Sequence, residues 1–371
     1  MVRLLVALAL VSGCSRSSAD DGKRKQPTAT KPVAGARGFR AAPWLAGARC
    51  VVGASKIAGA PLIVAGGKGW VRSFRPDGKQ VSAATGIGFV QRMELLDVRG
   101  DSAPELVVAW GRGRGALHVA ARLTIHDLAA LDRNVVTIEL PRTTRADVRG
   151  IASAGRHALW VAAFESKFMV SVLRVSRNDT GWHSEKVASA RVVLDLSAAD
   201  TDGDGTIDVF LARPYGDAKG APGTVARLRA GGVDNLPVVG GARAVLATRA
   251  GVIVADGWNR NYGRLARALI SRLDYRDGRW QRTQLAHVPK HVGYARLRAA
   301  DLDGDGKLDV VAAGDGPVVT VPVAGGSVRQ LTPASRYVSD VYPVDIDGDG
   351  KDEVVIAGDS PGIWGLAAPA R

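Results

Sequence analysis

The sequence predicts an all-β protein, specifically a seven-bladed β-propeller with calcium-binding loops, and three observations support this prediction. A short acidic motif occurs three times in the 371 residues. An apolar run of strand length follows each copy, and similar runs recur elsewhere at a nearly regular spacing. Repeats of roughly 40–50 residues built from strands and turns are typical of propellers, in which each repeat forms one blade.

The acidic motif has acids at positions 1, 3, 5 and 9 and glycines at positions 4 and 6. Four carboxylates this close repel one another unless a cation lies among them, and Ca²⁺ takes about six to eight oxygen ligands. Position 7 can add its backbone carbonyl. The predicted ligands are Asp200, Asp202, Asp204, Thr206 and Asp208 in the 200 loop (residues 200–208), Asp301, Asp303, Asp305, Lys307 and Asp309 in the 301 loop (residues 301–309), and Asp345, Asp347, Asp349, Lys351 and Glu353 in the 345 loop (residues 345–353).

These loops are not EF-hands, although the first six positions are similar. An EF-hand needs an acid at position 12, whereas this chain has Leu211, Ala312 and Ile356 there. A fourth, degenerate copy is the 97 loop (residues 97–105), which keeps the acids at positions 1, 5 and 9 but has Arg99 at position 3. We expect weak or no calcium binding there, because a guanidinium can take the place of the ion.

The spacing of the repeats predicts the number of blades. Apolar runs at 62–65, 159–162 and 252–255 survive without an acidic loop, and the loops before them are expected to start near residues 53, 150 and 243. Together with loop starts at 97, 200, 301 and 345, this gives seven repeats. Residues 38–45 are predicted to supply the missing fourth strand of the last blade, because closing the ring removes exposed sheet edges.

The loops with their following strand and Gly-rich turn resemble FG-GAP or VCBS repeats, which also occur in the propeller of integrin α-subunits. The resemblance covers residues 41–371 and is close in three repeats. It implies a seven-bladed propeller with Ca²⁺ in hairpin loops on one face. The resemblance further implies that these ions are structural and do no chemistry.

The N-terminus has the pattern of an export signal. A positive start and the apolar run 4–11 precede the residues Val11, Ser12, Gly13 and Cys14, which resemble a bacterial lipobox. Residues 1–13 are therefore predicted to be a lipoprotein signal peptide, Cys14 the lipidated residue, and 14–40 a flexible tether of polar composition. Because Ser15 rather than Asp follows the cysteine, we expect an outer-membrane location, on the periplasmic or the cell-surface side. Cys50, the second of two cysteines, is predicted to be a buried small residue.

The sequence contains no catalytic signature, and we expect no enzyme activity. It has no Gly-x-Ser-x-Gly elbow and no P-loop, and Pro289 separates the only close histidines, His287 and His291. The strand residues expected to line the central channel are apolar, which argues against a site there. They are Val108, Val161, Leu211, Val254, Val311 and Ile356.

The predicted function is a non-catalytic binding or scaffolding module at the cell envelope, with a protein or a polysaccharide as partner. The net charge of +14 comes from scattered arginines, so nucleic acid is not an expected partner, and the membrane is contacted through the lipid anchor only. The longest spacing holds a candidate binding segment, which could instead pack on a neighbouring blade: Trp258, Asn259, Arg260, Asn261 and Tyr262. Two alternatives stay open, a propeller hydrolase or lyase and an accessory lipoprotein of an outer-membrane assembly complex.

Overall fold

The computed structural model describes residues 38–57, 59–111, 121–141, 147–166, 168–216, 222–229, 232–256, 267–289, 293–332 and 337–365. Across these residues the chain is all-β, with a single 3-10 turn, η1 (Pro43–Leu45). None of the described segments forms a helix long and apolar enough to cross a membrane. The predicted signal peptide, Cys14, most of the tether and the segment Trp258 to Tyr262 lie outside the described residues.

The strands form six antiparallel sheets. The largest has seven strands: β2 (Cys50–Ile57), β3 (Ala60–Gly66), β4 (Lys68–Phe74), β5 (Gln80–Leu96), β6 (Glu105–Gly111), β7 (Arg122–Asp127) and β8 (Ala130–Glu139). Strand β5 is the middle strand of this sheet and joins its two halves, because its first part pairs with β4 and its second part with β6.

The other five sheets have four strands each. One contains β9 (Val148–Ser153), β10 (Ala158–Ser166), β11 (Met169–Asn178) and β12 (Gly181–Arg191), and the next β13 (Asp195–Ala199), β14 (Asp208–Tyr215), β15 (Pro222–Arg229) and β16 (Gly232–Leu236). Then come β17 (Ala244–Thr248), β18 (Gly251–Asp256), β19 (Arg267–Arg276) and β20 (Arg279–Pro289), followed by β21 (Gly293–Ala300), β22 (Asp309–Asp315), β23 (Val319–Pro322) and β24 (Arg329–Gln330). The last sheet joins β25 (Val338–Val344), β26 (Glu353–Gly358) and β27 (Gly362–Trp364) to β1 (Phe39–Ala41).

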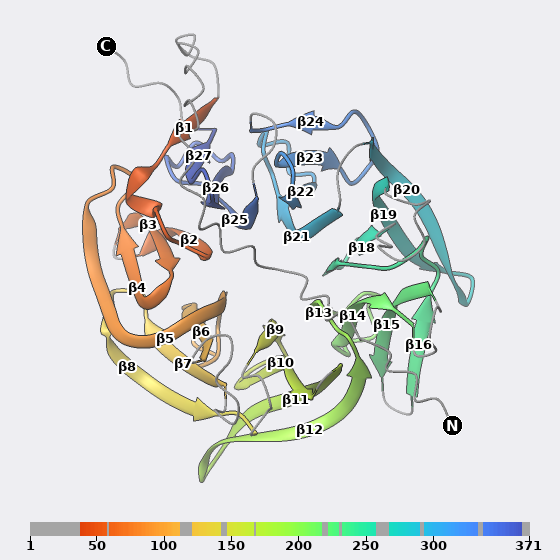
Figure 1. The fold of residues 1–371 in the computed structure, drawn as a ribbon, viewed down its shortest axis with the longest axis horizontal. Coiled ribbons are helices and arrows are strands. Elements are labelled where there is room, and N and C mark those ends of the chain that lie inside the picture. The colour runs from red at the N-terminus through yellow and green to blue at the C-terminus, as the bar shows by residue number, and fades with distance from the viewer. Residues whose placement is uncertain are drawn as a thin grey trace, which may run out of the picture.

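The sheets stand radially around a common centre (Figure 1). The first strand of each sheet, together with β5, forms a closed circle of contacts that runs from β2 through β5, β9, β13, β17, β21 and β25 back to β2. Radial sheets with the first strand of each at the centre are the architecture of a β-propeller. The predicted propeller fold is therefore confirmed.

The ring is closed by a strand from the start of the chain. Phe39 of β1 pairs with Trp364 of β27, and Ala41 pairs with Gly362. The prediction that residues 38–45 complete the last sheet is confirmed by this pairing, which covers the edge of β27 with hydrogen bonds.

The prediction that the apolar runs line the centre is wrong. Val108, Val161, Leu211, Val254, Val311 and Ile356 lie on the second strands of the sheets, β6, β10, β14, β18, β22 and β26, and are buried. A second strand is covered on both faces by neighbouring sheets and on both edges by its own sheet, so it needs a continuous apolar run. The first strands face the centre on one side and need no such run.

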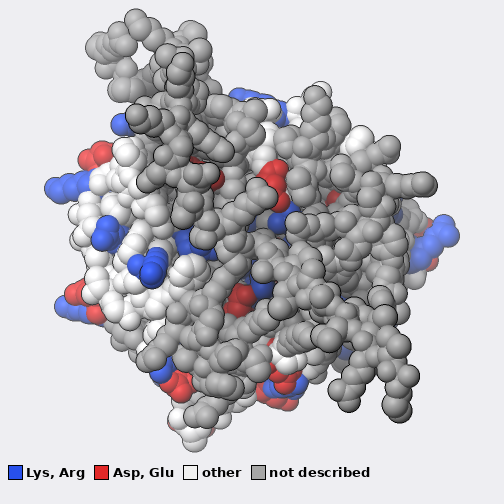
Figure 2. All heavy atoms as spheres, in the orientation of Figure 1, with Lys and Arg blue, Asp and Glu red and all other residues white. Residues whose placement is uncertain are grey.

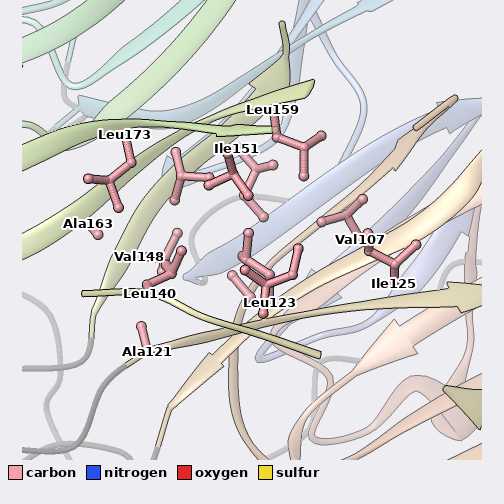
Figure 3. Packing of buried hydrophobic residues seen from close by; sticks show 14 of the residues in the cluster. Val107, Ala121, Leu123, Ile125, Leu140, Val148, Ile151, Leu159, Ala163 and Leu173 are labelled. Atoms are coloured by element: carbon pink, nitrogen blue, oxygen red, sulfur yellow. The ribbon is translucent and has the colours of Figure 1, made fainter. Parts of the chain in front are cut away.

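The hydrophobic core consists of separate layers between neighbouring sheets. In one layer Val107 and Leu123 of the seven-stranded sheet pack against Ile151, Leu159 and Leu173 of the next sheet (Figure 3). Such layers are built mainly from Val, Ala, Leu and Ile, as expected for a chain with only 5% aromatic residues. Cys50 is buried in a layer of this kind, as predicted, and burial raises the pKa of its thiol to about 12.

Neighbouring first strands approach closely where one of them has a glycine. A methyl group added to Gly150 of β9 would lie 2.6 Å from Cβ and 2.7 Å from the backbone nitrogen of Leu196 on β13. We expect Gly150→Ala to lower the free energy of unfolding by about 1–3 kcal/mol, because the backbones must move apart. Urea denaturation measures this. The matched control is Gly232→Ala on β16, where a methyl group meets no atom within 4 Å. Equal effects of the two substitutions would contradict the close approach of β9 and β13.

Candidate metal loops and the central channel

Each acidic loop connects the first strand of a sheet with the second. The 200, 301 and 345 loops begin where β13, β21 and β25 end, and their position-9 acids Asp208, Asp309 and Glu353 start β14, β22 and β26. The 97 loop connects β5 and β6 in the same way, and Glu105 starts β6. The four loops therefore have equivalent places in their repeats. Those of the 301 and 345 loops are neighbours, and one repeat separates the 97 loop from the 200 loop and the 200 loop from the 301 loop.

A common hydrogen-bond pattern shapes the loops. In the 200 loop the carboxylate of Asp200 accepts hydrogen bonds from the backbone N–H groups of Gly203 at 2.8 Å and Gly205 at 3.1 Å. Asp97, Asp301 and Asp345 accept from the equivalent positions 4 and 6. The two glycines of the 200 loop have φ of 77° and 82°, a region that glycine enters without strain.

Carboxylate oxygens converge in all three predicted calcium loops. One oxygen from each of three acids lies within 4.8 Å of the others in the sets Asp200–Asp202–Asp204, Asp301–Asp303–Asp305 and Asp345–Asp347–Glu353. Oxygens that bind one Ca²⁺ at about 2.3–2.6 Å can be no further apart than about 5 Å, so these sets are compatible with a calcium ion. The remaining predicted ligands are Thr206, Asp208, Lys307, Asp309, Asp349 and Lys351, which lie in the same loops but outside these sets.

A buried cation from another strand contacts the acids of the 200 loop. Nη2 of Arg227, on β15, lies 2.6 Å from Oδ2 of Asp202 and 2.6 Å from Oδ2 of Asp208. The side chain of Arg227 is only 4% exposed. Its hydrogen bond lowers the pKa of Asp202.

The 97 loop also contains a guanidinium. Nε of Arg99 lies 3.2 Å from Oε1 of Glu105, the position-9 acid, while Oε2 of Glu105 accepts from the N–H groups of Val98 and Arg99. Arg99 therefore lies against one acid of the loop, Glu105. Weak calcium binding at the 97 loop stays a prediction.

The 301 and 345 loops are connected to each other. The N–H of Asp301 donates to Oδ2 of Asp352 at 2.8 Å, and the N–H of Asp352 donates to the carbonyl of Asp301 at 2.8 Å. These two hydrogen bonds join neighbouring sheets. The position of one loop is thus tied to that of the other.

The centre of the ring is charged. A cavity of about 210 Å³ is lined by first strands, with Arg92, Glu94, Asp195, Arg296 and Arg298 among its walls. Arg298 of β21 donates two hydrogen bonds, of 2.9 and 2.8 Å, to the carboxylate of Glu94 on β5. Because β5 and β21 are not neighbours in the circle of first strands, this ion pair spans the channel.

The other charges of the channel are held by the backbone. Arg92 donates to the carbonyl oxygens of Arg149, Gln91 and Leu194, and burial, with the nearby charge of Arg296, lowers its pKa to about 10. Burial raises the pKa of Asp195, whose Oδ2 accepts from the N–H of Val245. These contacts hold the charged groups in fixed positions and leave little room for rearrangement.

Comparison with known proteins supports the fold. The chain is similar to BBS1N, solved in complex with ARL6DN, at 13% sequence identity and a TM-score of 0.53, over 92% of this chain and 96% of that one. A gluconolactonase of Xanthomonas campestris has 14% identity and a TM-score of 0.49 over 91% of this chain and 97% of its own, and the Dos1 propeller has 12% and 0.47 over 84% and 77%. The similarity is one of fold alone. No family model and no curated protein matches the chain, so membership of the FG-GAP or VCBS repeats stays a prediction.

Sequence reasoning missed the channel residues, although a regular signal marks them. Polar side chains stand five and three residues before position 1 of each acidic loop: Arg92 and Glu94, Asp195 and Ser197, Arg296 and Arg298, Asp340 and Tyr342. A spacing of two in a strand puts both side chains on one face. The first three pairs line the central cavity, and Asp340 contacts Arg296 of that lining at 3.5 Å. Arg227 was missed as well, because it lies far from its loop in sequence.

Proposed function

We propose that this chain is a seven-bladed, calcium-stabilised propeller that binds or scaffolds a partner at the bacterial cell envelope. The count of seven is supported by the circle of seven first strands. In this count the seven-stranded sheet comprises two blades, with β5 acting as the last strand of one and the first strand of the next.

The observation that carries the proposal is the geometry of the 301 and 345 loops. Each gathers carboxylate oxygens from three acids within 4.8 Å of one another. Lys307 pairs with Asp305 of the 301 loop at 2.7 Å, but its side chain is 75% exposed, whereas Arg227 beside the 200 loop is 4% exposed. Asp301, Asp303, Asp305 and Asp309 would hold one ion, and Asp345, Asp347, Asp349 and Glu353 the other, with the carbonyls of Lys307 and Lys351. A bound calcium ion would offset part of the negative charge of these acids, and the loop residues then hold the first strand of the blade against the second. This role is structural.

The envelope location rests on the N-terminal sequence. Lipidation of Cys14 would anchor the chain to the outer membrane, and residues 14–40 would tether the propeller to it. Positive and negative side chains are mixed over the described part of the face in Figure 2, without a broad patch of one sign. This mixture favours a protein or polysaccharide partner over nucleic acid. The segment Trp258 to Tyr262 is the candidate contact.

The test uses the Cys14→Ser protein immobilised in calcium and exposed to envelope extract. We expect the immobilised protein to retain a defined envelope protein or polysaccharide. The variant that combines Asp303→Asn with Asp347→Asn should not retain it. Trp258→Ala should weaken retention while leaving the melting curve unchanged. Retention of nothing in calcium, or equal retention by the double variant, would contradict a calcium-stabilised binding module.

A second candidate, a hydrolase or lyase, gains support from the charged channel. Asp195 lines the 210 Å³ cavity, and burial raises its pKa, as is common for general acids. Against this, Glu94 is fully engaged by Arg298. Release of a small sugar or acid from envelope extract by the wild-type protein, and its loss in Asp195→Asn, would favour the enzyme.

A further inference from the structure

We propose that Arg227 is the resident cation of the 200 loop, so that the protein binds two calcium ions rather than three. Both ions then lie in the adjoining 301 and 345 loops, where the ring is closed. This inference rests on the proposed calcium binding of those two loops. It assigns an arginine instead of a calcium ion to the 200 loop, although the acids of this loop match the motif as well as those of the other two copies do.

The geometry places the guanidinium where an ion would have to be. The acids at positions 3 and 9 both belong to the predicted ligand set of the motif, and position 3 is in each converging set of acids. In the 200 loop a single nitrogen, Nη2 of Arg227, lies 2.6 Å from both of these acids, Asp202 and Asp208. A divalent ion within a few ångströms of a guanidinium away from bulk water is strongly repelled. The two cations therefore exclude each other.

Arg227 is held firmly in this position. Its guanidinium lies 5.7 Å from the ring of Trp280 and 5.9 Å from that of Tyr275, both on strands of the next sheet. The side chains of Arg227 and Asp208 are 4% and 3% exposed. Moving the arginine out would leave a buried carboxylate and lose contacts with two aromatic rings, which is costly. This free-energy cost lowers the affinity of the 200 loop for calcium.

The other repeats provide an internal comparison. Arg227 pairs across the sheet with Phe210, two residues after position 9 of its loop. At the same place Thr320 pairs with Val311 after the 301 loop, and Ile363 pairs with Val355 after the 345 loop. The equivalent residue after the 97 loop is Ile125, opposite Val107, and there Arg99 supplies the guanidinium from within the loop. An arginine thus contacts the acids of the 97 and 200 loops, whereas the 301 and 345 loops have Thr and Ile at the strand position of Arg227.

The consequence is a division of the ring into two parts. The 301 and 345 loops are hydrogen-bonded through Asp301 and Asp352, and the 345 loop belongs to the sheet that β1 completes. Calcium therefore acts on the two sheets at the closure. The 97 and 200 loops keep their shape without it.

Native mass spectrometry of the full-length protein with calcium tests this directly. We expect two bound ions in the wild type. Three matched substitutions at position 3 assign them: Asp303→Asn and Asp347→Asn should each bind one ion, and Asp202→Asn should still bind two. A wild type that binds three ions, with Asp202→Asn reduced to two, would overturn the inference and leave the proposed function intact. A wild type that binds none or one would overturn the proposed function and this inference with it.

Arg227→Thr, which copies the residue after the 301 loop, should gain a third ion. Because this variant can fail to fold, hydrogen exchange of the wild type is the second measurement. Adding EDTA should speed amide exchange at least tenfold in residues 301–309 and 345–353 and less than twofold in residues 200–208. An equal acceleration in all three loops would show that the 200 loop also depends on calcium.

Discussion

Excess EDTA is expected to lower the melting temperature of the protein by about 10 °C relative to the calcium-loaded form. A ligand at about 100 times its dissociation constant stabilises the folded state by about 2.7 kcal/mol per site, so two sites contribute about 5 kcal/mol. Domains have a total stability of about 5–15 kcal/mol, and 1 kcal/mol corresponds to about 2–4 °C in proteins of some 150–250 residues. Differential scanning calorimetry in calcium and in EDTA measures the shift.

Variants of the two loops separate calcium binding from other effects of EDTA. The protein that combines Asp303→Asn with Asp347→Asn should melt at the same temperature in both solutions, near that of the wild type in EDTA. Asp202→Asn is the matched control and should keep the full response to EDTA. Coincident wild-type melting curves in calcium and EDTA would rule out a stabilising role of calcium.

Breaking the ion pair across the channel is expected to lower the free energy of unfolding by about 1–3 kcal/mol, because its side chains are only 20% and 17% exposed, while Asp340 stays 4.0 Å from Arg298. Glu94→Gln removes the carboxylate that accepts both hydrogen bonds of Arg298. Arg92, Arg296 and Arg298 then face one cavity with one acid fewer. Urea denaturation at neutral pH measures the loss.

The double variant Glu94→Gln, Arg298→Met should recover much of this loss, because no guanidinium is then left without Glu94, and Asp340 keeps Arg296 at 3.5 Å. The matched control is Glu139→Gln, which breaks the pair between Glu139 on β8 and Arg122 on β7. The side chain of Glu139 is 65% exposed and that of Arg122 is 41% exposed. An exposed pair contributes about 0–1 kcal/mol. If Glu94→Gln lowered the free energy of unfolding no more than Glu139→Gln does, the pair across the channel would not stabilise the fold.

The repeat could be predicted from the sequence because its signals are local. Positions 1, 4 and 6 of the acidic loop interact within six residues, so Asp200 and its glycines predict their own hydrogen bonds. The following apolar runs predict strands buried on both faces. The polar residues at −5 and −3, such as Arg296 and Arg298, were equally local, but they were overlooked because the apolar runs were assigned to the centre.

By itself, then, the sequence determined the β repeats, the shape of the acidic loops and the strand that closes the ring, since each depends on short-range patterns or on a missing strand. Only the tertiary structure decided which strands line the channel, that Glu94 meets Arg298 across 204 positions, and that Arg227 reaches Asp202 and Asp208. The physical reason is that these charges find their partners through the register of strands and the curvature of the ring. Neither is encoded in the spacing of residues along one strand.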